Sequence, residues 1–123
     1  MCKKIVNCFE GKVPNNIDDL TSLPGIGRKT ANVLLGEIYK KDVIIVDTHF
    51  TRLTNRLGFH NMKDPTKIEL FMKNLVPVGE ATSFCHRLVA HGRSICTATH
   101  PKCNICCLKE ICNFSYLYLQ TLA

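Results

Sequence analysis

The chain has 123 residues, of which 46% are apolar, so it can form one domain with a modest core and is not a disordered tail. A formal charge of +6 favours a polyanionic partner such as nucleic acid, although many proteins that bind none are equally basic. No apolar run approaches the ~18 residues of a membrane span, and the apolar start is too short for a secretory signal. We therefore expect a soluble intracellular protein with no membrane partner: cytoplasmic and nucleoid-associated in a bacterium, nuclear or organellar in a eukaryote.

Almost every periodic stretch of the chain predicts a helix, so the expected fold class is all-α. Residues 1–9 are typical of a helix that closes near Gly11, and Asn15 or Asn16 is placed to cap a short second helix. A tight turn then leads into a helix over residues 28–39. Its apolar residues follow the spacing of one helical face, at Ala31, Leu34, Leu35 and Ile38.

The run at residues 43–46 is apolar and β-branched, and alone it could form a buried strand. Because no second strand candidate lies nearby, we expect an extended buried connector instead. Asp47 follows this run where a helix N-cap belongs, and helical spacing then continues to Gly58.

Two further helices are predicted in the second half of the chain. Asp64 caps the first of them, with Pro65 in its first turn. The second is expected from about Glu80 to His91, ending at Gly92. A cysteine-rich loop and a short aromatic tail then close the chain.

The turn between the second and third helices can hold a phosphate. Glycines at alternate positions, Gly25 and Gly27, permit backbone angles that other residues avoid and allow a close approach to another surface. The amides of the turn and of the following helix start attract an anion, and this helix–hairpin–helix arrangement binds the DNA backbone without reading sequence. An ordinary helix–helix connection accounts for most such tripeptides. The candidate DNA-binding residues here are Leu23, Gly25, Ile26, Gly27 and Arg28.

Three segments of the chain resemble the endonuclease III family of DNA repair enzymes. They run from Leu23 to Val33, from Val46 through His49 to Arg56, and from His86 through Arg93 to Cys96. The resemblance extends from about Gly11 to Phe114 and matches the carboxy-terminal portion of the family only. The amino-terminal portion, which supplies one wall of the damaged-base pocket in the family, has no counterpart here.

Lys29 is the candidate nucleophile. It lies in the first turn of a helix beside Arg28, and both features disfavour a further positive charge, which leaves a lysine amine able to attack carbon. The alternative from the residues alone is a solvated lysine that touches phosphate. The resemblance implies instead that Lys29 attacks the sugar C1′ of a damaged nucleotide and forms an imine, after which β-elimination cuts the strand. It also implies that Asp47 stabilises the developing cation or helps to deprotonate Lys29.

Four of the eight cysteines form a candidate metal site, with six, two and five residues between Cys96, Cys103, Cys106 and Cys112. Without a secretory signal a disulfide framework is disfavoured, and the spacing alone leaves zinc and a [4Fe–4S] cluster nearly even. The resemblance favours the [4Fe–4S] cluster, because the family has this spacing, and makes Cys107 a spare thiol. Lys102 lies in the loop between the first two ligands, where the resemblance implies phosphate contact and the alternative is a solvated charge. Cys2, Cys8 and Cys85 are expected to be small buried apolar residues.

The resemblance implies a base-excision-repair DNA glycosylase that removes oxidised pyrimidines and cleaves abasic sites. Residues 1–91 would form the helix–hairpin–helix part, and residues 92–123 the cluster loop and tail. The expected partner is double-stranded DNA with damaged pyrimidines or abasic sites, bound by a monomer that needs the absent amino-terminal half for full activity. The alternatives are a DNA-binding module without catalysis and a zinc-stabilised interaction domain.

Overall fold

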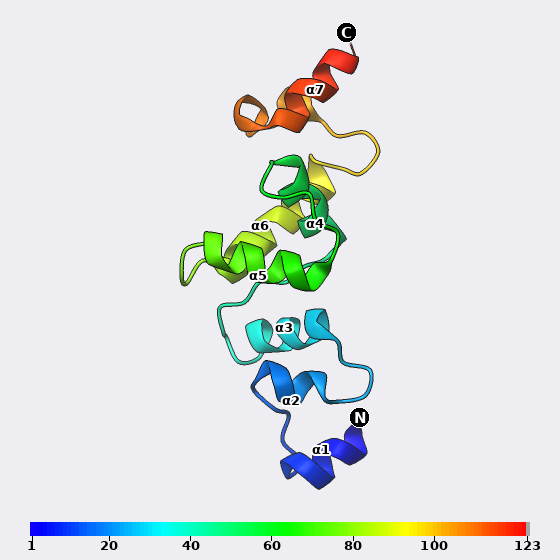
Figure 1. Ribbon diagram of the computed structural model, residues 1–123, viewed down its shortest axis with the longest axis vertical. Helices are drawn as coiled ribbons and strands as arrows, with labels where there is room; N and C mark the ends of the chain where they lie inside the picture. Colours follow the sequence, from blue (N-terminus) through cyan, green and yellow to red (C-terminus); the bar gives the residue numbers. More distant parts are fainter. Residues whose placement is uncertain (123) are drawn as a thin grey trace.

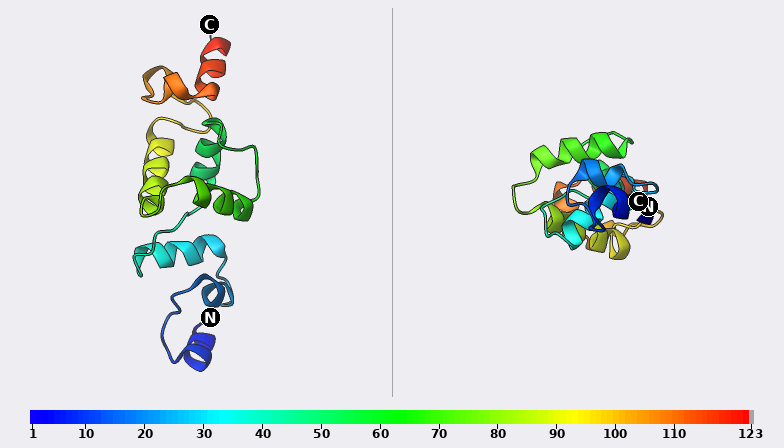
Figure 2. Two further views of the ribbon diagram at one scale, coloured as in Figure 1. Left: turned by 60° about the vertical axis from the view of Figure 1, so that its left-hand side comes forward. Right: turned by 90° about the horizontal axis from the view of Figure 1, so that it is seen from below.

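The computed structural model describes residues 1–122, which are helical with no strand among them, so the all-α prediction is confirmed for this range. Ala123, the last residue of the predicted 92–123 segment, lies outside the described residues. The helices are stacked along one long axis, with the two termini at opposite ends (Figure 1). Viewed along that axis, the helices overlap in a compact outline (Figure 2). No helix within residues 1–122 has the length and apolarity needed to cross a bilayer.

The amino-terminal layer consists of α1 (Cys2–Phe9), α2 (Ile17–Thr21) and α3 (Arg28–Glu37). The Asn16 side chain caps α2 by accepting a hydrogen bond from the Asp19 amide at 2.8 Å, as the sequence predicted. Helix α3 ends two residues before the predicted boundary. The apolar core of this layer is separate from that of the rest of the molecule, and its buried members are Leu20, Leu23, Ala31 and Leu35.

The connector to the next layer is extended and partly buried, as predicted, and is not paired as a strand. Its amides are bonded to α6 instead: Val43 N donates to the Thr82 hydroxyl at 3.0 Å, and Ile45 N donates to Cys85 Sγ at 3.3 Å. These bonds satisfy backbone amides that would be paired with a neighbouring strand if the segment were part of a sheet.

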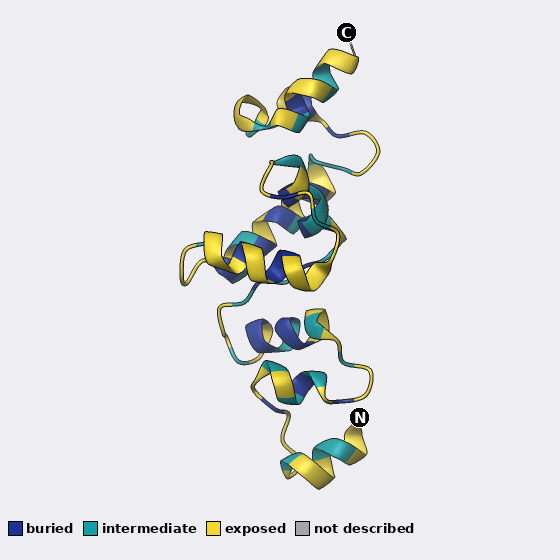
Figure 3. Cartoon of the chain, in the orientation of Figure 1, coloured by how far each residue is buried: buried dark blue, intermediate teal, exposed yellow. Residues whose placement is uncertain are grey.

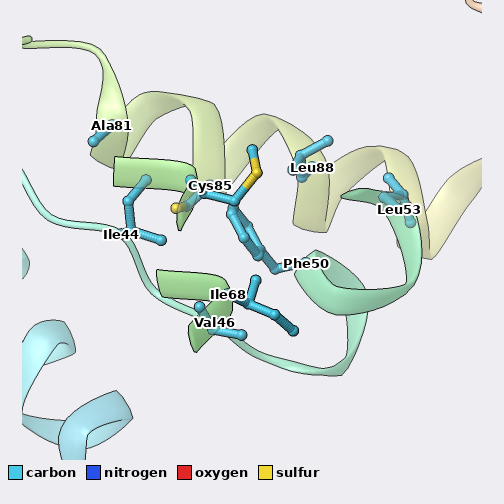
Figure 4. Packing of buried hydrophobic residues seen from close by; sticks show 9 residues of the cluster. Ile44, Val46, Phe50, Leu53, Ile68, Ala81, Cys85 and Leu88 are labelled. Atoms are coloured by element: carbon cyan, nitrogen blue, oxygen red, sulfur yellow. The ribbon is translucent and has the colours of Figure 1, made fainter. Parts of the chain in front are cut away.

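The central layer contains α4 (Thr48–Arg56), α5 (Pro65–Leu75) and α6 (Ala81–Ser94). Phe50 of α4 is fully buried and points into the middle of the core, among residues of the connector, α5 and α6 (Figure 4). Asp64 and Pro65 begin α5 as predicted, because the Asp64 carboxylate accepts from the Thr66 amide at 2.9 Å.

Helix α6 continues through Gly92 to Ser94, so the prediction that Gly92 ends it is wrong. Gly92 lies inside the helix where α4 approaches it closely. A Cβ atom at this position would stand 3.0 Å from Arg52 Nη2 and 3.1 Å from Leu53 Cδ1. The glycine therefore permits the packing of two helices and does not terminate one.

The carboxy-terminal layer contains two short 3-10 turns, η1 (Cys103–Ile105) and η2 (Lys109–Ile111), followed by α7 (Asn113–Thr121). Most of this layer is exposed (Figure 3). The sequence indicated only an aromatic tail after the cysteines, whereas the structure has a helix in which the rings of Phe114 and Tyr118 stack one turn apart at 5.8 Å.

Candidate functional site

The turn between α2 and α3 has the conformation of an open anion cradle. Gly25 has a φ of 83°, in the region that favours glycine, and Gly27 is the N-cap of α3. No atom lies within 4 Å of a Cβ built at either glycine, so the space in front of the turn is open to another surface. The first amides of α3 have no partner inside the helix, and an anion placed there would satisfy them.

The other predicted DNA-binding residues of the turn are placed differently. Leu23 is buried in the core of the amino-terminal layer, and Ile26 packs against that core. Their side chains therefore support the turn from behind. The Arg28 guanidinium, which the sequence offered as a DNA contact, is ion-paired with Glu69.

Lys29 is exposed in the first turn of α3. It lines a small cavity together with Arg28, Val46 and the amino-terminal part of α5. Val46 directly precedes Asp47, so the cavity brings Lys29 to the segment that carries the predicted carboxylate. The Asp47 carboxylate accepts from the Phe50 amide at 2.7 Å and caps α4, as predicted. Within residues 1–122, no hydrogen bond or ion pair joins Lys29 to Asp47 directly.

Glu69 is a site residue that the sequence prediction missed. It is 7% exposed, and its carboxylate accepts hydrogen bonds from Arg28 and from the Asn32 amide, both on α3. The bond to Glu69 raises the pKa of the Arg28 guanidinium, against an opposing effect of burial. The signal in the sequence was its position three residues before Met72, on the buried stripe of a helix.

The four predicted cysteine ligands line one cavity between α4, the end of α6 and the carboxy-terminal layer. Cys107 is exposed and is not part of its lining. Within residues 1–122, no three His, Cys, Asp or Glu side chains converge closely enough to hold a single metal ion. The four thiols therefore line a cavity and do not form a site for a single ion.

The groups around this cavity fit a sulfur-rich cluster. Arg56 Nη1 donates to Cys96 Sγ at 3.3 Å, and the Leu108 amide donates to Cys106 Sγ at 3.4 Å. The Ser115 hydroxyl also lines the cavity and is buried with no hydrogen-bond partner among residues 1–122, so within this part of the chain it can donate to a further acceptor in the cavity. Burial, with the neighbouring thiols as a smaller cause, raises the pKa of Cys106, and a cation in the cavity would offset this effect.

The remaining cysteines separate into two kinds. Cys85 is buried in the central core, as expected, and burial raises the pKa of its thiol to about 11. Cys2 and Cys8 are exposed, so the expectation that they are buried is wrong. Both lie on α1, which has no buried residue.

Two arginines of α4 join the cysteine loop to the central layer, a role that the sequence did not reveal. Arg52 donates to the carbonyl oxygens of Gly92 and Cys96 at 3.0 and 2.9 Å. Arg56 donates to the carbonyl oxygens of Thr97 and Ala98 at 2.8 and 3.0 Å.

Lys102, the last predicted DNA contact, is exposed in the same loop. Its segment lies toward the opposite end of the molecule from the turn between α2 and α3 (Figure 1). The structure thus gathers the turn, Lys29 and the start of α4 in one region and leaves Lys102 with the cysteines.

Comparisons with known proteins show what this chain is similar to. Residues 9–36 match the family described as helix-hairpin-helix motif. The chain is 46% identical over 113 residues to endonuclease III of Buchnera aphidicola subsp. Baizongia pistaciae, covering 92% of this chain and 53% of that protein. It is 40% identical over 112 residues to endonuclease III of Synechocystis sp., covering 90% and 51%. The chain therefore spans about half the length of the curated relatives it matches.

Solved structures show the same fold. A non-covalent endonuclease III–DNA complex matches with a TM-score of 0.90 and 33% identity, over 97% of this chain and 56% of that one. A trapped endonuclease III–DNA covalent intermediate matches with a TM-score of 0.90 and 34% identity, over 96% and 56%. A thermostable thymine-DNA glycosylase matches with a TM-score of 0.83 and 26% identity, over 94% and 55%.

Proposed function

The chain is the counterpart of the carboxy-terminal part of endonuclease III, and we propose from this that it carries the catalytic amine of a base-excision-repair DNA glycosylase with lyase activity. Residues 1–91 would bind and cleave DNA, and residues 92–123 would hold the metal cluster. Its substrate would be double-stranded DNA with oxidised pyrimidines or abasic sites. A monomer would act on it together with the portion of the fold that this chain does not span.

In the proposed reaction, the Lys29 amine attacks the sugar C1′ of the damaged nucleotide. The bond between C1′ and the base breaks, and the base leaves with its electron pair and takes up a proton. The attacking nitrogen loses a proton, and its lone pair then forms the C=N bond of a protonated imine as the bond between C1′ and the ring oxygen breaks and that oxygen takes up a proton. C2′ next loses a proton, a double bond forms between C2′ and C3′, and the bond between C3′ and its oxygen breaks, so that the 3′ phosphate leaves and the strand is cut.

Asp47 would assist at the first step. A carboxylate fixed by its cap bond to the Phe50 amide cannot turn away, and it would stabilise the cation that develops at C1′. The same carboxylate can take a proton from the incoming amine. Capping and catalysis are compatible, because the cap bond sets the rotamer that the chemistry needs.

Cys96, Cys103, Cys106 and Cys112 would hold a [4Fe–4S] cluster, whose bonds to four thiolates fix the loop. Neither imine formation nor β-elimination requires electron transfer. In this proposal the cluster is therefore structural, and Lys102 in the same loop would contact a DNA phosphate.

The observation that carries the proposal is the placement of an exposed lysine in the first turn of α3, directly after an open turn suited to phosphate. A phosphate bound at the turn would bring the neighbouring sugars to the cavity that Lys29 lines. Fixed proximity of this kind contributes a large share of enzymatic rate acceleration.

Borohydride reduction tests this proposal on DNA with an abasic site, a substrate that does not require a complete base pocket. The unmodified chain should form a covalent adduct with the DNA, and Lys29→Gln should form none. Lys67→Gln, which changes an exposed lysine on α5, is the matched control and should form the adduct. A chain that binds this DNA but forms no adduct would instead be a DNA-binding module without catalysis.

A further inference from the structure

The proposed nucleophile and its carboxylate partner are anchored on two different apolar cores. Lys29 lies on α3, which packs on the core of the amino-terminal layer. Asp47 begins α4, whose Phe50 lies at the centre of the other core. The separation of the two groups therefore depends on what holds one layer against the other, and not on either core alone.

One partly buried polar cluster spans the two layers at the start of α3, where the Glu69 side chain is 9% exposed and the Arg28 side chain 39%. The Glu69 carboxylate, on α5 of the central layer, accepts from Arg28 Nε at 3.3 Å, from Arg28 Nη2, and from Asn32 Nδ2. Arg28 and Asn32 are one helical turn apart, so a single carboxylate holds one face of α3. Glu69 thus restrains both the distance between α3 and α5 and the rotation of α3 about its own axis.

The cluster immediately adjoins the proposed reaction site. Arg28 precedes Lys29 in the chain, and the cavity that Lys29 lines has Glu69, Pro65 and Thr66 of α5 in its wall. A carboxylate with a side chain only 9% exposed is costly to bury unless it is paired, so its partners are held firmly in place.

A second polar contact between the two layers provides a natural contrast. Glu37, at the end of α3, pairs with His86 of α6 at 3.1 Å, but the two side chains are 53% and 59% exposed. An exposed pair of this kind contributes little to stability. The far end of α3 leads into the connector, whose amides are bonded to α6, whereas the end that carries Lys29 is held on the central layer by Glu69.

We propose that Glu69 is a positioning residue that sets the placement of Lys29 relative to Asp47 by holding the start of α3 on α5. This inference rests on the proposed function. The role is distinct from DNA binding, because Glu69 is buried beneath the helix and is negatively charged. It also gives Arg28 a task within the protein in place of a DNA contact.

Single-turnover borohydride trapping on abasic-site DNA tests the proposal, alongside the affinity for DNA with an uncleavable abasic-site analogue. Glu69→Gln keeps the shape of the side chain and removes its charge. It should slow trapping by roughly 10- to 100-fold, because small displacements of reacting groups have effects of this size. The dissociation constant should remain within about threefold of the unmodified value, since the turn that binds phosphate is retained.

Two comparisons distinguish positioning from general destabilisation. Glu37→Gln, the matched carboxylate at the exposed end of α3, should trap at the unmodified rate. Arg28→Gln should also slow trapping, and the double variant should be no slower than the slower single variant, because both changes break the contact between Arg28 and Glu69. Equal losses of trapping and DNA affinity, or additive effects in the double variant, would overturn the proposal.

Hydrogen exchange provides a readout that does not depend on activity. In Glu69→Gln the hydrogen-bonded amides of α3 from Ala31 onward and the amides of residues 40–46 should exchange faster, while those around Phe50 in α4 remain protected. If the unmodified chain forms no adduct at all, the proposed function fails, and exchange alone then decides whether Glu69 holds α3. Unchanged exchange in these segments would refute that role as well.

Discussion

The hairpin end of the molecule, residues 1–39, has an apolar core of its own, whereas the cysteine end, residues 95–122, has almost none. Leu20 and Ala31 are fully buried in the hairpin end. At the cysteine end Ile105, Ile111 and Tyr116 are all more than 60% exposed. Contacts to the central layer come instead from arginine side chains bonded to loop carbonyl oxygens.

This difference indicates how each end acquires a fixed shape. The hairpin end buries enough apolar surface to hold its turn open and ready for a phosphate. The cysteine end buries too little apolar surface to do so, and directional hydrogen bonds hold its loop to the central layer. The turn proposed to bind phosphate is thus preorganised by the chain, whereas the cysteine loop would, under the proposed function, be fixed further by the cluster that its four thiols hold.

The largest expected effect comes from removing one thiol of the cavity. Cys103→Ser should abolish the iron content and visible absorption of the purified protein, because a structural metal site with a missing ligand loses most of its binding free energy. Amides of α7 should then exchange with solvent without protection, while those of α3 remain protected. Visible spectroscopy, iron analysis and hydrogen exchange measure these outcomes.

Cys107→Ser is the control, since Cys107 is exposed outside the cavity. It should retain iron and absorption. An equal loss in both variants would show that the ligand assignment is wrong. Loss of protection in α3 together with α7 would show that the two ends are not organised independently.

The next largest effect should destabilise the hairpin end and leave the cysteine end unchanged. Leu20→Ala removes a side chain that is 0% exposed in the hairpin core and should lower the free energy of unfolding by about 2–5 kcal/mol. Protection of α3 should fall while the visible absorption persists. Ile38→Ala, at a side chain that is 57% exposed near the end of α3, should change the unfolding free energy far less. Urea unfolding, followed by circular dichroism for the helices and by visible absorption for the cysteine end, would distinguish the unfolding of the two ends. Loss of absorption at the same urea concentration as loss of helix would show that the two ends do not unfold independently.

The same contrast explains what the sequence could predict. Helices with one apolar face, such as α3, were found from their spacing, and the caps at Asn16, Asp47 and Asp64 marked where helices begin. Helix α7 was missed because apolar residues surround it, so no face stands out. A helix buried on one side shows a periodic spacing of apolar residues, and the helix of the cysteine end has little buried surface.

Features that depend on distant partners could not be read from local pattern. Gly92 resembles a helix terminator, and only the approach of Arg52 and Leu53 reveals its packing role. The position of Glu69 on the buried stripe of α5 indicates burial but not its partner, since Arg28 is 41 residues away in sequence. The cysteines were predictable as a set, since their spacing is local, but the exclusion of Cys107 rested on a resemblance.

A smaller effect tests the polar bonds of the cysteine end in isolation. Arg56 donates to Thr97 O, Ala98 O and Cys96 Sγ, and its guanidinium lies 4.3 Å from the centre of the Phe114 ring. Lysine keeps the charge but cannot make several of these bonds at once, because it lacks the planar fork. Arg56→Lys should therefore destabilise the loop by about 1.5–3 kcal/mol, the range for hydrogen bonds to charged groups. In a chelator, the visible absorption should decay several-fold faster than in the unmodified protein.

Arg87→Lys, at an exposed position on α6 that makes no such bonds to the described part of the chain, controls for the change of residue type and should decay at the unmodified rate. Helicity of the hairpin end should be the same in both variants, because its apolar core is not altered. A chelator-independent loss of α3 protection in Arg56→Lys would mean that the arginine supports the whole molecule. If the absorption of Arg56→Lys decays at the unmodified rate, the bonds from the thiols alone would fix the loop. The arginine contacts would then not be needed to hold the loop in the shape that binds the cluster.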